Sequence, residues 1–409
     1  MLKHLAGVAL VLIGATVAWF ILGSTLAVRT QGSDTVQRDQ LAAEWGSEQR
    51  QIAPTFWLAT RHLDKKGRPY FEQAAMAPAS SRIDVDLALD PRQKGLLWYN
   101  TYGVGFTATY RIANPGPGER VHVDFSFPSD NATYDDVTVD VDGKRVPVTS
   151  ASGVIAAPLP AGHGRLSTVL VRYRSHGIGT WTYKFGEGVV SVHDFVLTMN
   201  TNFRAIDFPA KTLSPTAKQE TPDGWRLTWN YRDLVGGFGV GMAFPQRLQP
   251  GPLAERITFW APLSLLFYVF VMLVITTLRR IDLHPINYFF LAAAFFAFHL
   301  LFAYTVDRIP VGWAFVICSV VSMFLTVSYL RLVAGLRFAA VEAALAQFFY
   351  LILFSYALFD EGYSGLSITI GAIVTLFVTM QVTGRIDWSE RFAGKRFAPP
   401  PAEPYSSPS

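Results

Sequence analysis

Six runs of about twenty predominantly apolar residues limit what this chain can fold into. They lie near residues 5–27, 257–278, 286–305, 310–330, 338–359 and 364–384. A helix needs about 20 such residues to cross the hydrocarbon core of a bilayer. Composition agrees, because 50% of the 409 residues are hydrophobic and only 16% are charged. The sequence therefore predicts a multi-pass α-helical membrane protein.

The first run is compatible with a cleaved signal peptide or with an uncleaved anchor. Thr25 and Ala27 loosely fit the small-residue rule of a cleavage site. The apolar core is longer than the roughly 7–15 residues of a signal peptide. We therefore favour an N-terminal transmembrane anchor over residues 1–27.

Basic residues indicate the orientation, because lysine and arginine concentrate on the cytoplasmic side of membrane proteins. If the spans simply alternate, all basic clusters beside them fall on one side. These residues are Lys3, Arg279, Arg280, Arg331, Arg337, Arg385, Arg391, Lys395 and Arg396. The pattern predicts that both termini are cytoplasmic and that residues of about 28–255 are extracytoplasmic.

The long polar segment has the two-residue period of β-strands. In "RVHVDFSFP", Val121, Val123 and Phe125 alternate with polar residues, and "TVLVRYR" and "WRLTWNY" repeat the alternation. In "VTVDVDGKRVPV", a turn at Asp142–Gly143 separates two such runs and predicts a hairpin. We expect an all-β sandwich-like domain over residues 80–255.

Three further segments complete the predicted organisation. Residues 28–79 are expected to form a juxtamembrane helical or linker segment, since "DTVQRDQLAAEWGSEQRQI" has helical spacing. Residues 256–385 should form a five-helix transmembrane bundle. Residues 386–409 end in "APPPAEPYSSPS" and should be a disordered cytoplasmic tail.

Several chemical functions lack the residues that they need. The only cysteine, Cys318, lies in the fourth run, so the outer segment has no disulfide or thiolate site. The acidic run "DDVTVDVDG" fails as a calcium loop, because its twelfth position is Thr149 rather than glutamate. No phosphate-binding G-x-x-x-x-G-K-[ST] occurs, and a net charge of +4 does not favour nucleic-acid binding. We predict no cofactor, no metal and no catalytic residue.

Polar residues inside the apolar runs are the candidate functional positions. Glu342 and Gln347 lie in the fifth run and His299 lies in the third. Intramembrane acids are costly and usually face a partner or a wet cavity. One interpretation is a proton or cation relay through Glu342, His299 and Tyr304. The favoured interpretation is that Glu342 pairs with Arg331 or Arg337.

His299 in the third run and His284 just before it have simple structural interpretations. His299 is the only polar interruption of "FFAFHLL", and such a residue most often hydrogen-bonds across a helix interface. His284 precedes Pro285, and proline is favoured in the first helical turn, so His284 should mark a helix start at the water boundary.

A serine protease is the remote alternative. "GYSG" places Ser364 at the start of the last run, which resembles the serine motif of rhomboid-type proteases. In those proteases histidine follows serine, and no histidine follows Ser364 here. We expect the Ser364 hydroxyl to bond to backbone N–H groups at a helix start instead.

Four segments resemble the CreD family of bacterial inner-membrane proteins. "RDQLAAEWGSEQRQIAP" resembles the stretch that opens that family's periplasmic region. "LHPINYFFLAAAFFAFHLLFAYTVDRIPVGWAF" is similar to the segment after its second span, and "SYLRLVAG" and "TGRIDW" resemble further family elements. The β-rich middle is similar only in outline, which indicates a divergent member. The resemblance implies a role in envelope integrity and in stress or toxin tolerance, without an established reaction.

Two classes of function are consistent with these observations. The first is a non-enzymatic inner-membrane protein whose periplasmic β domain binds an envelope partner. The second is a small-solute or ion transporter or channel that uses Glu342 and His299. The bilayer is a partner in either case. The sequence leaves open the identity of the other partner and the oligomeric state.

Overall fold

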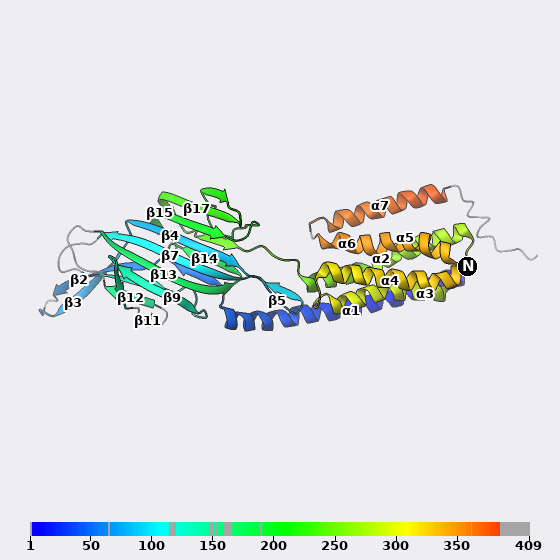
Figure 1. Cartoon of the computed structure of the whole chain (residues 1–409), viewed down its shortest axis with the longest axis horizontal. Helices are drawn as coiled ribbons and strands as arrows, with labels where there is room; N and C mark the ends of the chain where they lie inside the picture. Colours follow the sequence, from blue (N-terminus) through cyan, green and yellow to red (C-terminus); the bar gives the residue numbers. More distant parts are fainter. Residues whose placement is uncertain are drawn as a thin grey trace, which may run out of the picture. The chain divides into compact units, whose positions relative to one another are not determined.

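The computed structural model describes residues 2–63, 66–113, 120–147, 150–151, 154–158, 166–188, 190–360 and 362–384. The chain divides into two compact units. The helical unit contains residues 1–30 and 250–409, and the β unit contains residues 31–249 (Figure 1). The predicted tail, residues 386–409, lies outside the described residues.

Among the described residues, six helical stretches are long and apolar enough to cross a membrane, and each contains most or all of one predicted run. Their elements are α1 (Leu2–Trp45), α2 (Pro250–Arg279), α3 (Pro285–Thr305), α4 (Val311–Ala334), η1 (Phe338–Ala343), α5 (Ala344–Gln347), η2 (Phe348–Leu353), α6 (Phe354–Tyr356), η3 (Ala357–Phe359) and α7 (Ser364–Thr383). The prediction of a multi-pass helical membrane protein is confirmed.

The fifth span is not a regular α-helix. It contains two π-helical segments, η1 and η2, separated by the single α-helical turn of α5. Nothing in the apolar pattern of this run distinguished it from the other five. Short π-helical stretches inside helices are rare and occur frequently at functional sites.

Helix α1 extends well beyond the predicted anchor. It contains 44 residues, and the part from residue 31 onward belongs to the β unit. There Leu41 packs in a small cluster with Leu97, Tyr99 and Ile178. The helix ends where Gly46 adopts a φ of 102° and its N–H donates to the carbonyl of Ala42 at 2.9 Å. A left-handed glycine after the last turn is a common helix terminator.

The expectation of a helical or linker segment up to residue 79 was wrong beyond Trp45. This part contains three strands, β1 (Gln49–Ile52), β2 (Thr55–Leu63) and β3 (Pro69–Met76). The inward positions of β1 are glutamines, Gln49 and Gln51, both fully buried. An alternation of apolar and polar residues therefore does not appear in this strand.

Hydrogen bonds replace apolar burial at these two glutamines. The amide of Gln49 donates to the Ser175 hydroxyl at 2.8 Å and to the His176 carbonyl at 2.7 Å. The amide oxygen of Gln51 accepts from the Tyr173 hydroxyl at 2.8 Å. Their partners lie more than 120 residues away, so tertiary contacts rather than local pattern make this segment a strand.

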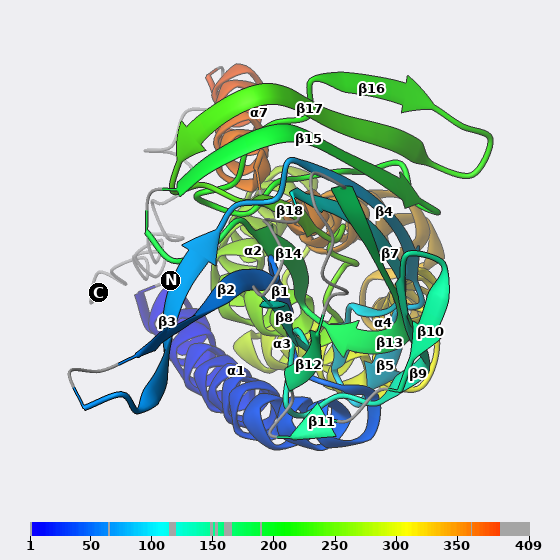
Figure 2. The same cartoon turned by 90° about the vertical axis from the view of Figure 1, so that its left-hand side faces the viewer.

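The remaining strands of the β unit are β4 (Ser80–Leu89), β5 (Arg92–Lys94), β6 (Leu97–Tyr99), β7 (Thr101–Ala113), β8 (Arg120–Ser126), β9 (Tyr134–Val141), β10 (Lys144–Val146), β11 (Ser150–Ala151), β12 (Val154–Pro158), β13 (Leu166–Ile178), β14 (Thr180–Lys184), β15 (Val190–Thr201), β16 (Ala217–Glu220), β17 (Trp225–Gly236) and β18 (Val240–Ala243). The largest sheet has the order β10-β9-β13-β7-β4-β15-β17-β16, and a second has the order β11-β12-β8-β2-β3. A three-stranded sheet contains β1, β14 and β18, and β5 pairs with β6. Figure 2 shows β15, β17 and β16 as neighbouring strands of the largest sheet.

One hydrophobic core joins the three larger sheets. Phe106 and Leu197 come from the largest sheet, Val123 and Phe125 from the second, and Trp181 from the third. These five side chains are at most 2% exposed. Sheets that share one core form a sandwich-like arrangement. The predicted β-rich region is therefore confirmed, together with the buried alternation of β8.

The predicted hairpin is also present. Strands β9 and β10 are antiparallel, with Val141 opposite Lys144. Between them Asp142 and Gly143 have φ values of 49° and 78°. Two consecutive positive φ angles are required by the tight turn that suits the twist of a hairpin, and the Asp-Gly dipeptide favours it.

Candidate functional site

Glu342 lies in η1 and forms an ion pair inside the helical unit. Its Oε1 accepts a hydrogen bond from Nη2 of Arg279, at the end of α2, at 2.6 Å. Its Oε2 is buried and has no hydrogen-bond partner among the described residues. The predicted partners, Arg331 and Arg337, were wrong. The ion pair follows from the packing of α2 beside the fifth span, which spacing along one helix does not show.

Gln347 ends α5 and connects three helices. It is fully buried, and its Nε2 donates to the Ser322 hydroxyl of α4 at 2.8 Å. That hydroxyl donates to the backbone carbonyl of Ala294 in α3 at 2.7 Å. The amide oxygen of Gln347 is buried without a hydrogen-bond partner among the described residues.

His299 is 1% exposed and sits among aromatic rings. Its Nδ1 is 2.9 Å from the Phe295 carbonyl one turn earlier, so Nδ1 carries the proton and donates. Trp19 of α1 meets the imidazole edge-on, with ring centroids 5.5 Å apart. Imidazole Nε2 and the Trp19 indole nitrogen are both buried and lack hydrogen-bond partners among the described residues. The imidazole thus bonds within its own helix, and its contact with the first span is aromatic.

His284 has the structural role that the sequence indicated. It is the residue before α3, with extended backbone, and its ring accepts from the Ile286 N–H at 3.3 Å. Pro285 occupies the first helical position. Capping of a helix start by a side-chain acceptor accounts for His284 without a ligand.

The structure does not bring the candidate positions into one site. Among the described residues, no hydrogen bond or ion pair links Glu342, His299, Gln347 or Tyr304 to one another, and no group of three metal-ligating side chains occurs. Tyr304 is 55% exposed and lies under the Arg29 guanidinium, 5.4 Å from the ring centroid.

The expected role of Ser364 as a helix cap was wrong. Ser364 is itself the first residue of α7, and the cap position is occupied by Tyr363, which forms no side-chain capping bond. The helix begins one residue earlier than it would if Ser364 were the cap. Among the described residues, the His299 imidazole contacts Phe295, Trp19 and Phe298, and it forms no hydrogen bond with Ser364.

Buried polar atoms of three further residues in the spans were not identified from the sequence. They are the Tyr268 hydroxyl, the Thr326 hydroxyl and the Trp19 indole nitrogen, each without a hydrogen-bond partner among the described residues. Tyrosine, tryptophan and threonine occur commonly in apolar spans, so their burial carries no sequence signal. His299, Glu342 and Gln347 each have one such atom as well. Buried polar atoms in a membrane cost free energy, and such groups often mark pathways for substrates or ions.

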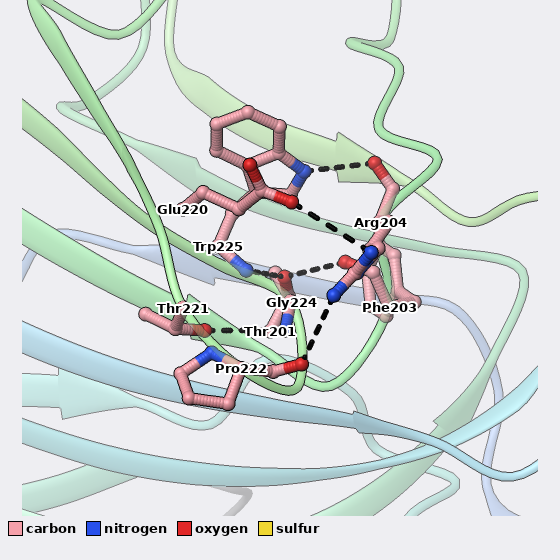
Figure 3. Close-up of polar contacts among 8 residues, drawn as sticks. All are labelled: Thr201, Phe203, Arg204, Glu220, Thr221, Pro222, Gly224 and Trp225. Carbon is pink, nitrogen blue, oxygen red and sulfur yellow. Dashed lines mark hydrogen bonds and ion pairs between the residues drawn. The ribbon is translucent and has the colours of Figure 1, made fainter.

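A second polar cluster lies in the β unit, where the β16–β17 turn contacts the segment after β15 (Figure 3). The Thr201 hydroxyl accepts from the Trp225 N–H at 3.0 Å and donates to the Phe203 carbonyl at 2.9 Å. The Trp225 indole donates to the Arg204 carbonyl at 2.8 Å. A Cβ at Gly224 would lie 2.2 Å from the Thr201 carbonyl oxygen, so only glycine permits this approach.

The charged members of this cluster are exposed. The Arg204 guanidinium lies 3.8 Å from a Glu220 oxygen and donates to the Pro222 carbonyl at 3.3 Å. Both charged side chains are more than half exposed, and an exposed ion pair contributes little stability. These contacts hold the turn against the segment after β15.

Ser191, His193 and Asp233 form an arrangement on the β15–β17 surface that the sequence analysis did not identify. His193 Nδ1 is 2.6 Å from Asp233 Oδ1, and its Nε2 is 3.5 Å from the Ser191 hydroxyl. All three side chains are exposed. Nucleophilic catalysis also needs aligned oxyanion donors and protection from water. Because all three side chains are exposed, this surface group is not protected from water.

Comparison with known families identifies the five C-terminal spans and the end of the β unit. Residues 208–389 match the family model described as inner membrane protein CreD. The chain is CreD-like over this region. The match begins after β15 and continues through the five C-terminal spans, and it confirms the resemblance seen in the sequence. The CreD family is not a known enzyme family.

Other comparisons add little. No curated protein shows significant sequence similarity to this chain. The M1 zinc metallopeptidase from Deinococcus radiodurans is 12% identical, with a TM-score of 0.25, and the alignment covers 41% of this chain and 42% of that one. Yeast LTA4 hydrolase in complex with bestatin is 8% identical, with a TM-score of 0.23 and coverage of 80% and 69%. The chain thus spans less than half of the first structure. At such TM-scores these similarities carry no argument.

Proposed function

We propose that this CreD-like protein is a non-enzymatic bacterial inner-membrane protein that supports cell-envelope integrity under stress or toxin exposure. The β unit lies in the periplasm and binds an envelope partner. The observation that carries the proposal is the extent of the CreD match, which runs without interruption from the last strands of the β unit through the five C-terminal spans. A binding domain continuous with a membrane bundle suits a protein that links the membrane to an envelope component.

The β unit offers a surface for such a partner. Val235 and Phe238 are 71% and 52% exposed, at the end of β17 and in the turn that follows it. They lie within the CreD-like region, in the sequence "LVGGFGV". Exposed apolar side chains that lie together are typical of protein interaction surfaces. We infer that this turn contacts the partner.

The test combines a phenotype with crosslinking. A photoreactive amino acid replaces Phe238 in one variant and Arg174, a 74% exposed side chain on β13, in a control variant. Cells that lack the protein should become sensitive to envelope-disrupting compounds. The Phe238 variant should restore tolerance and crosslink to a defined envelope protein, whereas the Arg174 variant should restore tolerance without that product. Normal tolerance in the deletion strain would refute the proposed role, and equal crosslinking at both positions would refute the surface.

A transporter or channel is the second candidate, and the buried polar atoms that lack hydrogen-bond partners in the described spans, together with the π-helical fifth span, favour it. Glu342 and Gln347 both lie at or beside these π-helical segments. Purified protein in proteoliposomes should then carry protons or small cations, and Glu342→Gln should abolish the flux while the protein stays folded. Absence of flux above that of empty liposomes would exclude this candidate.

A further inference from the structure

A lateral groove lies on the helical unit between α4 and the fifth span. Its volume is about 560 Å³. Leu336 and Ile352 contribute from the segment after α4. The other lining residues follow one stripe of α4, at the three- and four-residue spacing of a helix face. They are Ser319, Val320, Met323, Phe324, Val327, Ser328 and Arg331.

The groove is apolar along almost its whole length. Its two serines do not offer free donors, because the Ser319 hydroxyl donates to the Phe315 carbonyl at 2.7 Å and the Ser328 hydroxyl to the Leu325 carbonyl at 3.1 Å. Both bonds lie within α4. The half-buried side chains of Val327 and Ile352 line the groove, and Phe324 is 69% exposed beside them. A surface of this kind suits a hydrocarbon chain.

Arg331 is the single charged residue among those that line the groove. Its side chain is exposed, and no described residue forms an ion pair with it. Arg331 follows Ser319 by twelve positions, which corresponds to about 18 Å along a helix. One leaflet of the hydrocarbon core is about 15 Å thick. The groove therefore spans about one leaflet and ends in an unpaired cation near its surface.

We propose that this groove binds an anionic glycerophospholipid, with one acyl chain along α4 and the phosphate on Arg331. A guanidinium presents parallel N–H donors that match phosphate oxygens. Basic residues at the cytoplasmic ends of transmembrane helices are known sites for anionic head groups. No acidic residue lines the groove to oppose a negative head group. The occupant comes from the leaflet at which Arg331 lies.

Native mass spectrometry of the full chain in detergent tests this site with two probes of equal chain length, dioleoyl phosphatidylglycerol and dioleoyl phosphatidylcholine. The wild-type protein should bind the anionic lipid about tenfold more tightly. Arg331→Gln should remove the preference while both lipids still bind, and Arg331→Lys should retain part of it. Val327→Phe fills the groove and should reduce binding of both lipids.

Matched controls separate the groove from general effects. Val321→Phe makes the same change on α4 at an exposed position that does not line the groove. Arg337→Gln removes a nearby charge outside it. Both controls should bind lipid as the wild type does. Equal lipid binding by the Val327→Phe and Val321→Phe proteins, or no head-group preference in the wild type, would overturn the proposal. A dimer that is lost only in Val327→Phe would assign the groove to a second copy instead.

Discussion

At the scale of single residues, the Glu342–Arg279 pair decides between a structural and a functional interpretation of the intramembrane acid. Arg279 is 56% exposed, so solvent screens the pair and its contribution to stability should be about 1 kcal/mol or less. We predict that Glu342→Gln slightly lowers the melting temperature in detergent and leaves envelope tolerance intact. Arg279→Gln should have a similar effect. The double variant should lose less stability than the sum of the losses in the two single variants.

The other two arginines provide the control for this coupling. Arg331→Gln and Arg337→Gln, each combined with Glu342→Gln, should give additive changes in stability, since the ion pair of Glu342 is with Arg279. Coupling to Arg337 instead of Arg279 would contradict the observed pairing. Loss of envelope tolerance in a folded Glu342→Gln protein would support the transporter.

The Gln347–Ser322 hydrogen bond gives a second prediction at this scale. Ser322→Ala removes the acceptor of the buried Gln347 amide and should lower the free energy of unfolding by about 1–3 kcal/mol. Ser322→Ala combined with Gln347→Met removes both partners and should recover most of that loss. Thermal unfolding in detergent measures the stability of the single and the double variant. A double variant as unstable as Ser322→Ala alone would show that the amide is not the group left unsatisfied.

At the scale of elements, Gly46 limits the length of α1. Its φ of 102° disfavours any other residue, and an added Cβ would lie 2.4 Å from the His176 carbonyl oxygen. We predict that Gly46→Ala destabilises the protein by more than 1 kcal/mol. Gly67→Ala is the matched control, because Gly67 also has a positive φ but no atom within 4 Å of an added Cβ. If both variants lost the same free energy of unfolding in denaturant, backbone strain alone would explain the need for glycine at position 46.

The tyrosines of the β unit predict how its stability depends on pH. Burial raises the pKa of Tyr134 to about 12, although its hydrogen bond with Ser129 lowers the pKa slightly. Burial likewise raises the pKa of Tyr102, Tyr110 and Tyr173. The folded state holds these tyrosine protons more tightly than the unfolded chain does. Their contribution to the free energy of unfolding is therefore present below about pH 10, and it declines as the pH rises through the folded pKa.

The measurement is the melting temperature of the full chain between pH 8 and pH 12. It should fall steeply above about pH 10, and Tyr134→Phe should make the fall less steep. Tyr70→Phe, which replaces an exposed tyrosine on β3, should leave the slope unchanged. A melting temperature that does not change up to pH 12 would show that the buried tyrosines do not control alkaline stability.

At the scale of the whole molecule, the six spans and the basic clusters predict a topology. Reporter fusions near residues 150 and 308 should report an extracytoplasmic location, and fusions near residues 282 and 334 a cytoplasmic one. This follows from alternation of the spans and the positions of lysine and arginine in the sequence. A cytoplasmic signal from the fusion near residue 150 would contradict both the orientation and the proposed periplasmic binding of the β unit.

The sequence by itself determined the features that depend on neighbouring residues. The six spans follow from the length of the apolar runs, and the hairpin at Asp142–Gly143 follows from a dipeptide that accepts positive φ. The start of α3 follows from His284 and Pro285 for the same local reason. The CreD resemblance, carried by quoted segments, was confirmed over residues 208–389.

The tertiary structure decided the features that depend on distant partners. Strand β1 has glutamines at its inward positions because residues more than 120 positions away form hydrogen bonds with the Gln49 amide nitrogen and the Gln51 amide oxygen. Glu342 pairs with Arg279 because two separate helices pack together, and Arg331 is left at the end of a groove that α4 and the fifth span form jointly. Packing between elements that are distant in the sequence sets these contacts. The hydrophobic period indicates which face of an element is buried, but it does not indicate which residue lies opposite.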